Sequence, residues 1–185
     1  MPTIRPYQPK DKENVRGVCI ACGPAAGLTQ GPKYDLELLT FCDYYVECEP
    51  QNCFVIADDE DEAVGYIMCA ESFQSYRERF LREYAPRVKG FARRVVCQGS
   101  ARMPRLFAKG YPAHMHINIL ELYQRLGLGS QLVDTLAAHL RAKGVPGLML
   151  GVGAGNVKGR SFYNKYGFKR LLRVPGCVLM GLDLQ

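Results

Sequence analysis

The stretch QRLGLGSQ, residues 124–131, decides how this chain is interpreted. The β-rich run HINIL (116–120) precedes it, and apolar residues at helical spacing follow it, so the pattern predicts a strand that turns into a helix through two glycines. Glycines let the backbone approach a ligand closely. The first N–H groups of a helix are unpaired and carry partial positive charge. The turn therefore suits phosphate oxygens, although a tight turn without a ligand would have the same sequence.

Two common nucleotide-binding patterns do not fit this turn. It is not G-x-x-x-x-G-K-[ST], which excludes a nucleoside-triphosphate P-loop. It also lacks the third glycine of a dinucleotide fingerprint.

The composition is that of an ordinary soluble protein, with 48% hydrophobic and 23% charged residues among 185. This length suffices for one domain with a sizeable core, so we expect a single domain over 1–185. No apolar run reaches the roughly 18 residues of a membrane span. The N-terminal MPTIRPYQPK has no apolar signal-peptide core. We therefore expect a cytoplasmic protein without a membrane partner.

The formal net charge of +6 suits nucleic acid or a polyanionic small ligand. A nucleic-acid module needs a recognisable motif beside the charge, and the sequence shows none. We expect no nucleic-acid partner; salt-dependent binding to random DNA would test this alternative.

The eight cysteines do not predict a metal site. Cys19 and Cys22 form one C-x-x-C pair, but a second pair or a C-x-x-H is missing, so a structural zinc site lacks its other half. Disulfides are not expected without a secretory signal. Most of the cysteines have apolar neighbours and fit the role of small core residues.

Hydrophobic periodicity and Gly/Pro punctuation predict a mixed α/β domain with one central sheet. Residues 74–110 form a helical and basic insertion, with a helix broken near Pro86. The expected strands cover residues 3–7, 53–61, 63–73, 111–120, 147–152, 168–174 and 177–184, and the expected helices cover 9–23, 34–50, 127–143 and 156–167.

A second segment supports the phosphate-binding interpretation. Asn156, the predicted N-cap of a helix, starts the pattern N-x6-F-Y-x-K-x-G-F, which ends at Phe168. Together with Q-R-L-G-L-G and the strand before it, this pattern resembles the GCN5-related N-acetyltransferase (GNAT) family over nearly the whole chain. The resemblance implies an α/β (α+β) fold with a single central, mixed but mostly antiparallel sheet and helices on both faces. It also implies acetyl-CoA as cosubstrate and no metal. Since dimers are common in the family, it is compatible with a homodimer as well.

Within the family, the chain looks like bacterial acetyltransferases related to the C-terminal acetyltransferase-like domain of O-GlcNAc hydrolases. The stretches YPAHMHINILELYQRLGLG and LGVGAGNVKGRSFYNKYGF carry this finer resemblance. Those relatives often have Asp where this chain has Asn118, which matters if that acid serves catalysis or acceptor binding.

The resemblance assigns the cofactor contacts. The strand before the turn would pair through its backbone with the pantetheine arm, as an added strand does. The amides of the turn would hold the pyrophosphate, and Asn156 would bond the pantetheine besides capping its helix. The expected cofactor-binding residues are Ile119, Leu120, Gln124, Arg125, Leu126, Gly127, Leu128, Gly129, Ser130, Asn156, Ser161 and Tyr163.

Tyr163 is the expected catalytic acid. It lies seven residues after Asn156, where the family places a tyrosine whose hydroxyl faces the coenzyme sulfur. A phenol there can donate a proton to the departing thiolate. The alternative is a core tyrosine whose hydroxyl is bonded by a neighbour.

The base that would deprotonate the amine acceptor is less defined. His114, His116 and Asn118 alternate on the strand before the turn and therefore share one face. His116 is the preferred base and Asn118 a catalytic or acceptor-binding residue; a β-bulge, frequent on this strand in the family, would reverse the face. Glu71, structural histidines, or a water chain are the alternatives.

The insertion is the expected source of acceptor specificity. Its arginines, interleaved with aromatic residues, suit an acidic or sugar-like acceptor, but an amphipathic cover over the sheet would show the same pattern. The resulting hypothesis is an acetyl-CoA-dependent N-acetyltransferase that acts on a primary amine of a small molecule by direct attack on the thioester. The alternative is a non-catalytic acetyltransferase-like module that binds CoA or serves interaction.

Overall fold

The computed structural model describes residues 1–90 and 103–185, so residues 91–102 of the predicted insertion, with one of the eight cysteines, Cys97, lie outside it. The strands of the described residues are β1 (Thr3–Pro6), β2 (Cys53–Ala57), β3 (Ala63–Ala70), β4 (Ala113–Ile119), β5 (Gly147–Gly153), β6 (Lys169–Val174) and β7 (Cys177–Asp183). They form one sheet in the order β1-β2-β3-β4-β5-β7-β6, in which only the β4–β5 pair is parallel. This confirms the predicted fold class, an α/β fold around one mixed, mostly antiparallel sheet.

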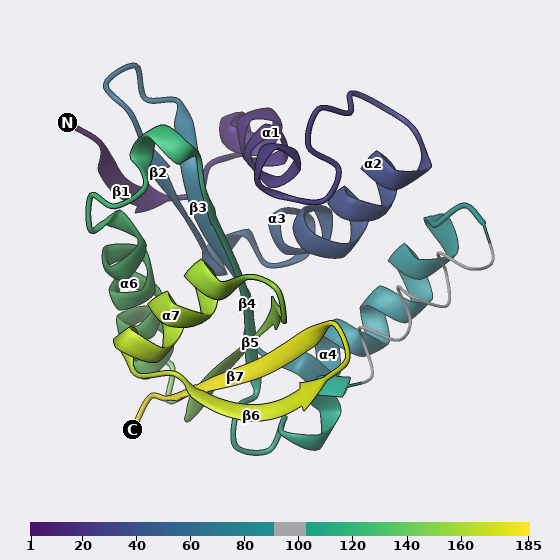
Figure 1. Cartoon of the computed structure of the whole chain (residues 1–185), viewed down its shortest axis with the longest axis vertical. Coiled ribbons are helices and arrows are strands. Elements are labelled where there is room, and N and C mark those ends of the chain that lie inside the picture. Colours follow the sequence, from purple (N-terminus) through teal and green to yellow (C-terminus); the bar gives the residue numbers. More distant parts are fainter. Residues whose placement is uncertain (91–102) are drawn as a thin grey trace.

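Helices cover both faces of the sheet. Figure 1 shows α1, α2 and α3 on one side and α6 and α7 on the other. The helices are α1 (Lys12–Cys22), α2 (Pro32–Leu38), α3 (Tyr44–Cys48), α4 (Phe73–Arg79), α6 (Leu128–Ala142) and α7 (Val157–Tyr166).

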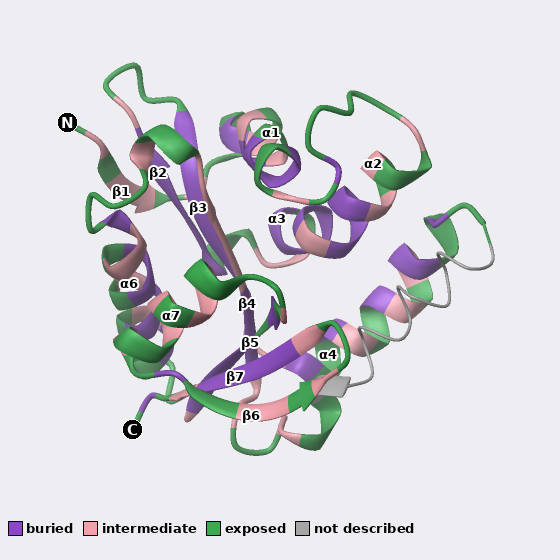
Figure 2. Cartoon of the chain, in the orientation of Figure 1, coloured by how far each residue is buried: buried purple, intermediate pink, exposed green. Residues whose placement is uncertain are grey.

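Each face of the sheet has its own apolar cluster. Along β3, Tyr66 and Met68 join the cluster with α1, α3 and α4, whereas Ile67 and Cys69 join the one with α6. This follows from the alternation of side chains across a strand. Figure 2 shows β2 and β3 buried throughout, as expected for central strands covered on both sides.

The β4 strand loses its neighbour on one side halfway along its length. It pairs with β5 only at Ala113–Leu148 and His114–Met149, so the two strands separate from there on. Its first three residues are buried and the last four only partly so. A gap therefore opens in the sheet beside the second half of β4, next to the glycine turn.

On its other side, β4 pairs with β3 in unbroken register from Ala70–His114 to Gly65–Ile119. The bulge that would have reversed the faces is therefore not present between these two strands. His114, His116 and Asn118 share one face, as the alternation predicted.

Several element boundaries differ from the prediction. The helix expected over 34–50 consists of α2, a π-helical turn at Leu39–Asp43, and α3. The strand expected over 53–61 ends at Ala57, because the Asp58 carboxylate accepts the N–H groups of the turn that follows. The strand expected to reach residue 73 ends at Ala70.

The described part of the insertion packs against α3. Four aromatic residues, in this part and directly before it, are at most 4% exposed, and two of them contact the rings of α3: Tyr76 contacts Tyr44 and Tyr45, and Tyr84 contacts Tyr44. They are Phe73, Tyr76, Phe80 and Tyr84. These rings belong to the core, as in an amphipathic cover.

Candidate functional site

The glycine turn connects β4 to α6 through a left-handed backbone. Gly127 caps α6 with φ +78°, and Arg125 has φ +63°. Left-handed conformations cost an L residue about 1–2 kcal/mol, which favours glycine at position 127. The chain thereby reverses within a few residues and directs its amides outward.

Five consecutive amides of this turn, from Arg125 to Gly129, have no hydrogen-bond partner among the described residues. The next two, of Ser130 and Gln131, donate to the Gly127 carbonyl oxygen at 3.1 and 3.2 Å. Residues 124–127 are exposed. A row of free N–H groups at the positive end of a 15-residue helix is a ready site for phosphate oxygens.

The predicted residues of this turn play different structural parts. The Leu128 side chain is buried, so only its unpaired amide can contribute to a ligand site, and the Ser130 amide is already engaged. A Cβ on Gly129 would lie 3.4 Å from the Phe162 ring of α7, which makes this glycine a close packing point between the two helices.

The open side of β4 presents backbone groups as well. The Leu120 N–H donates to Val64 O on the β3 side, at 3.0 Å. Because alternate residues direct their backbone groups to opposite sides, Ile117 and Ile119 direct theirs into the gap. The structure therefore places Ile119, but not the Leu120 amide, where an extended amide chain would pair.

Gln124 is turned toward the strand instead of the rim of the turn. Its Nε2 donates to the Ile119 carbonyl oxygen at 2.8 Å, and the Cys22 thiol lies 3.5 Å from the same oxygen. No local sequence pattern marks either contact.

Tyr163 lies partly buried on α7, with ring contacts to Phe162 and Phe168 at 5.3 and 5.4 Å. Its hydroxyl has no hydrogen-bond partner within the described residues. The alternative role, a core tyrosine whose hydroxyl is bonded by a neighbour, therefore finds no such neighbour among them. Burial raises the pKa of Tyr163 to about 12, and the phenol therefore keeps its proton at neutral pH.

Asn156 caps α7, as predicted: its Oδ1 accepts the Gly159 N–H at 2.8 Å. The side-chain amide nitrogen is left for another contact. Ser161 lies exposed on the same helix.

The two histidines of β4 lie among aromatic rings. The His114 Nδ1 is 3.0 Å from the buried Tyr45 hydroxyl, whereas His116 contacts the rings of Phe41 and Tyr45 at 4.7 and 5.7 Å. Burial lowers the pKa of His114 to about 4, and burial together with His114 lowers the pKa of His116 to about 3. Both imidazoles are therefore neutral at physiological pH.

Asn118 and Glu71 are both engaged. The Asn118 Nδ2 donates to the hydroxyl of the fully buried Tyr66 at 2.8 Å. Glu71 forms an ion pair with Lys143, the residue that follows α6, on the face of the sheet opposite His116. The structure thus brings Asn118 and His116 to one face and excludes Glu71 from it.

His116 and Tyr163 pack against different faces of the sheet. The sheet separates these faces except where β4 and β5 part. The gap beside Ile117 and Ile119 is thus where groups from both faces can meet one ligand.

A family model described as "Acetyltransferase (GNAT) family" matches residues 24–168, which include β4, the glycine turn and α7. The chain belongs to the GNAT acetyltransferase family. The free amides of the turn and the gap in the sheet are thus features of a GNAT fold.

Solved structures support this assignment. The structure titled "Crystal structure of SsHAT" has a TM-score of 0.87 and 25% identity over 100% of this chain and 98% of that one. Ard1 from Thermoplasma volcanium (TM-score 0.62, 18% identity, coverage 100% and 98%) shares the fold. So does the PaiA N-acetyltransferase from Thermoplasma acidophilum in complex with coenzyme A (TM-score 0.62, 15% identity, coverage 99% and 99%).

These findings confirm the predicted family. The finer resemblance to relatives of the O-GlcNAc hydrolase domain stays a prediction. In the described parts of the chain, no three His, Cys, Asp or Glu side chains gather as a metal site would require. The described helices include none with the length and apolar character to cross a bilayer.

Proposed function

We propose that this GNAT protein transfers the acetyl group of acetyl-CoA to the primary amine of a small molecule, by direct attack of the amine on the thioester. The observation that carries the proposal is the run of five free amides, Arg125 to Gly129, at the end of a strand whose open side faces a gap. Backbone amides at a helix N-terminus recognise phosphate oxygens, and an open strand edge recognises the amides of an extended chain. Acetyl-CoA has both ligand groups in one molecule: a pyrophosphate and an extended arm with amides.

In this proposal the free amides hold the pyrophosphate, with Arg125 at the rim. The backbone of Ile119, supported by Ile117, pairs with the pantetheine arm. The Ile119 carbonyl then exchanges its bond from Gln124 for one from the ligand, which frees Gln124 for the rim. Asn156 and Ser161 complete the site from α7.

Tyr163 acts as the proton donor. When the amine nitrogen forms its bond to the acetyl carbon, the carbon–sulfur bond breaks and the sulfur leaves as a thiolate. A phenol whose pKa is raised to about 12 is protonated at that moment and can donate. No protein nucleophile is required, so the cysteines need no covalent role.

On the acceptor side, His116 is the proposed base and Asn118 helps bind the amine. His116 is neutral and can accept a proton or a hydrogen bond from the nitrogen. A pKa of about 3 makes His116 a weak base at the working pH, so its part is to accept a hydrogen bond from an amine that has already lost its extra proton to water. An amine that arrives uncharged suits this site best.

Calorimetric titration with acetyl-CoA and desulfo-CoA tests the cofactor site. Gly129→Asp places a carboxylate among the amides, where a helix N-terminus tolerates it but phosphate is repelled. Ala138→Asp adds the same charge to an exposed position of α6, nine residues farther along, and is the matched control. We expect micromolar binding that only Gly129→Asp abolishes. Absence of binding at millimolar acetyl-CoA would refute the proposal.

A panel of amines with detection of released thiol tests turnover. An N-acetyltransferase releases coenzyme A only when its acceptor is present. Binding without transfer to any amine would instead support the alternative of a non-catalytic CoA-binding module. The cytoplasmic location and the homodimer remain predictions, tested by cell fractionation and by solution mass measurement.

A further inference from the structure

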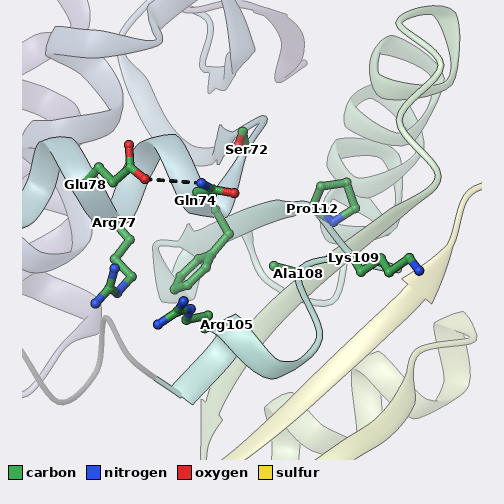
Figure 3. Close-up of a pocket in the computed structure, with 9 residues that line it drawn as sticks. Ser72, Gln74, Arg77, Glu78, Arg105, Ala108, Lys109 and Pro112 are labelled. Atoms are coloured by element: carbon green, nitrogen blue, oxygen red, sulfur yellow. Dashed lines mark hydrogen bonds between the residues drawn. The ribbon is translucent and has the colours of Figure 1, made fainter.

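A cavity lies at the end of β4 that is opposite the glycine turn. It has a volume of about 510 Å³, within the range of small-molecule sites. Its walls come from the start of α4 and from the segment that leads into β4 (Figure 3). Three cations and three apolar residues dominate the lining: Arg77, Arg105, Lys109, Phe73, Ala108 and Pro112.

The positive charge of this cavity is not balanced within the described structure. None of its three cations forms an ion pair with a described residue. The only acid in the lining, Glu78, accepts a hydrogen bond from Gln74 at 3.2 Å. Residues 91–102 contain no Asp or Glu, so their sequence offers no counter-charge either.

Two of the three unpaired cations, Arg77 and Arg105, are arginines that lie in the same part of the cavity. Figure 3 shows the guanidinium groups of Arg77 and Arg105 extending to the same side of the cavity. The Arg77 Nε is buried and has no hydrogen-bond partner in the described structure. Guanidinium groups that converge without a carboxylate repel each other, and a buried N–H without an acceptor costs about 1–3 kcal/mol. Such a donor calls for an explanation, and a bound anion that accepts its hydrogen bond is one.

We propose that this cavity binds a small organic anion, a phosphate or carboxylate attached to a compact apolar body. The guanidinium groups bind the oxyanion, since their fork of N–H donors matches its oxygens. Phe73, Ala108 and Pro112 contact the apolar body. The site goes beyond the proposed acetyl transfer, because β4 separates it from the glycine turn.

Titration of the full chain with phenyl phosphate, benzoate and inorganic phosphate, at constant ionic strength, tests the proposal. We expect saturable binding that is tighter for phenyl phosphate than for inorganic phosphate, which lacks the apolar body. The variant Arg77→Gln/Arg105→Gln should weaken it about tenfold or more, as expected for lost charge-assisted hydrogen bonds. The matched control Arg79→Gln/Arg82→Gln removes two arginines of the same segment that pair with Glu83 outside the cavity, and should bind like wild type.

Thermal unfolding at low salt without ligand gives a second readout. Arginines kept for stability lower the melting temperature when replaced, whereas arginines kept for a ligand leave it unchanged or raise it. Acetyl-CoA binding should be the same in both double variants, so failure of this site and failure of the acetyl-CoA site are distinguishable.

Three results would overturn the proposal. The first is no saturable binding of any of the three anions at about 10 mM, far weaker than a specific site requires. The second is equal weakening in the control variant. The third is binding of random duplex DNA that depends on Arg77 and Arg105 while the small anions do not bind, which would assign the charge to nucleic acid.

Discussion

Acidification from about pH 7 to about pH 5 should destabilise this protein through the histidines of β4. Both are neutral in the folded state, because burial lowers the pKa of His114 to about 4 and of His116 to about 3. In the unfolded chain they titrate near pH 6.5. Below that pH these histidines bind protons in the unfolded chain but stay neutral in the folded protein. Stability is therefore present above about pH 6.5 and is lost as the pH falls toward the folded-state values.

The size of the loss follows from the unfolded state. At about pH 5 an unfolded histidine is almost fully protonated, whereas a folded one with a pKa of about 4 is mostly neutral, which amounts to about 2 kcal/mol per histidine. The share of His116 is discounted, since this residue is only partly buried. The groups that face His114, namely Tyr45, Phe73 and Tyr76, include no carboxylate that would hold a proton on it. Burial raises the pKa of Asp43 and Glu37, which opposes the trend.

Urea unfolding at the two pH values, on wild type and on His114→Gln and His116→Gln, measures the effect. The contribution of the carboxylates to the pH dependence of unfolding cancels when wild type and variant are compared, because the carboxylates titrate in both. We expect His114→Gln to remove about 2 kcal/mol of the pH dependence, even if it lowers stability at both pH values. His139→Gln, on α6, is the control, with a smaller change. A pH dependence unchanged by both β4 variants would show that these histidines are not held neutral, and the argument about His116 would fail.

Four further substitutions test two hydroxyl groups and two left-handed glycines. Tyr163→Phe should leave acetyl-CoA affinity unchanged and stability within about 0.5 kcal/mol, because the hydroxyl has no described partner. Acetyl transfer, followed by thiol release, should fall about a hundredfold or more; a normal rate would exclude Tyr163 as the acid. Gly127→Ala should lose about 1 kcal/mol in urea unfolding because of its φ of +78°, and Gly144→Ala, with φ +72° and open space around it, should lose the same. Tyr66→Phe should cost about 1–2 kcal/mol, because it removes the acceptor of the Asn118 amide; an unchanged midpoint would contradict that bond.

The parts of the site that sequence predicted are those built from neighbouring residues. The glycine turn and the Asn156 cap follow from local backbone chemistry, which adjacent residues determine. The shared face of His114 and His116 follows from the strand period, once the unbroken register excludes a bulge.

The parts that sequence did not predict depend on distant segments. Tyr45 bonds His114 across 69 positions and Tyr66 bonds Asn118 across 52, and no local pattern marks either pair. The insertion was ambiguous for the same reason. Its aromatic residues and arginines alternate along the chain, but only the packing shows that the rings enter the core while Arg77 remains at a cavity.

The net charge of +6 suggested a polyanionic ligand, but the positive charge is concentrated in one segment and not spread around the glycine turn. Residues 74–110 contain ten Lys or Arg and two Glu, so the rest of the chain has a slightly negative balance. Three of its described cations, Arg77, Arg105 and Lys109, line the cavity at the far end of β4, about 20 Å from the glycine turn along the seven residues of the strand. That distance is about twice the Debye length at physiological salt. The insertion therefore contributes little to a phosphate held by backbone amides. Acetyl-CoA affinity at about 0.15 M salt should be the same for wild type and Arg77→Gln/Arg105→Gln, whereas Arg125→Gln should weaken it. A weaker affinity in the double variant alone would place the phosphates of the coenzyme in the cationic cavity and refute the assignment of both sites.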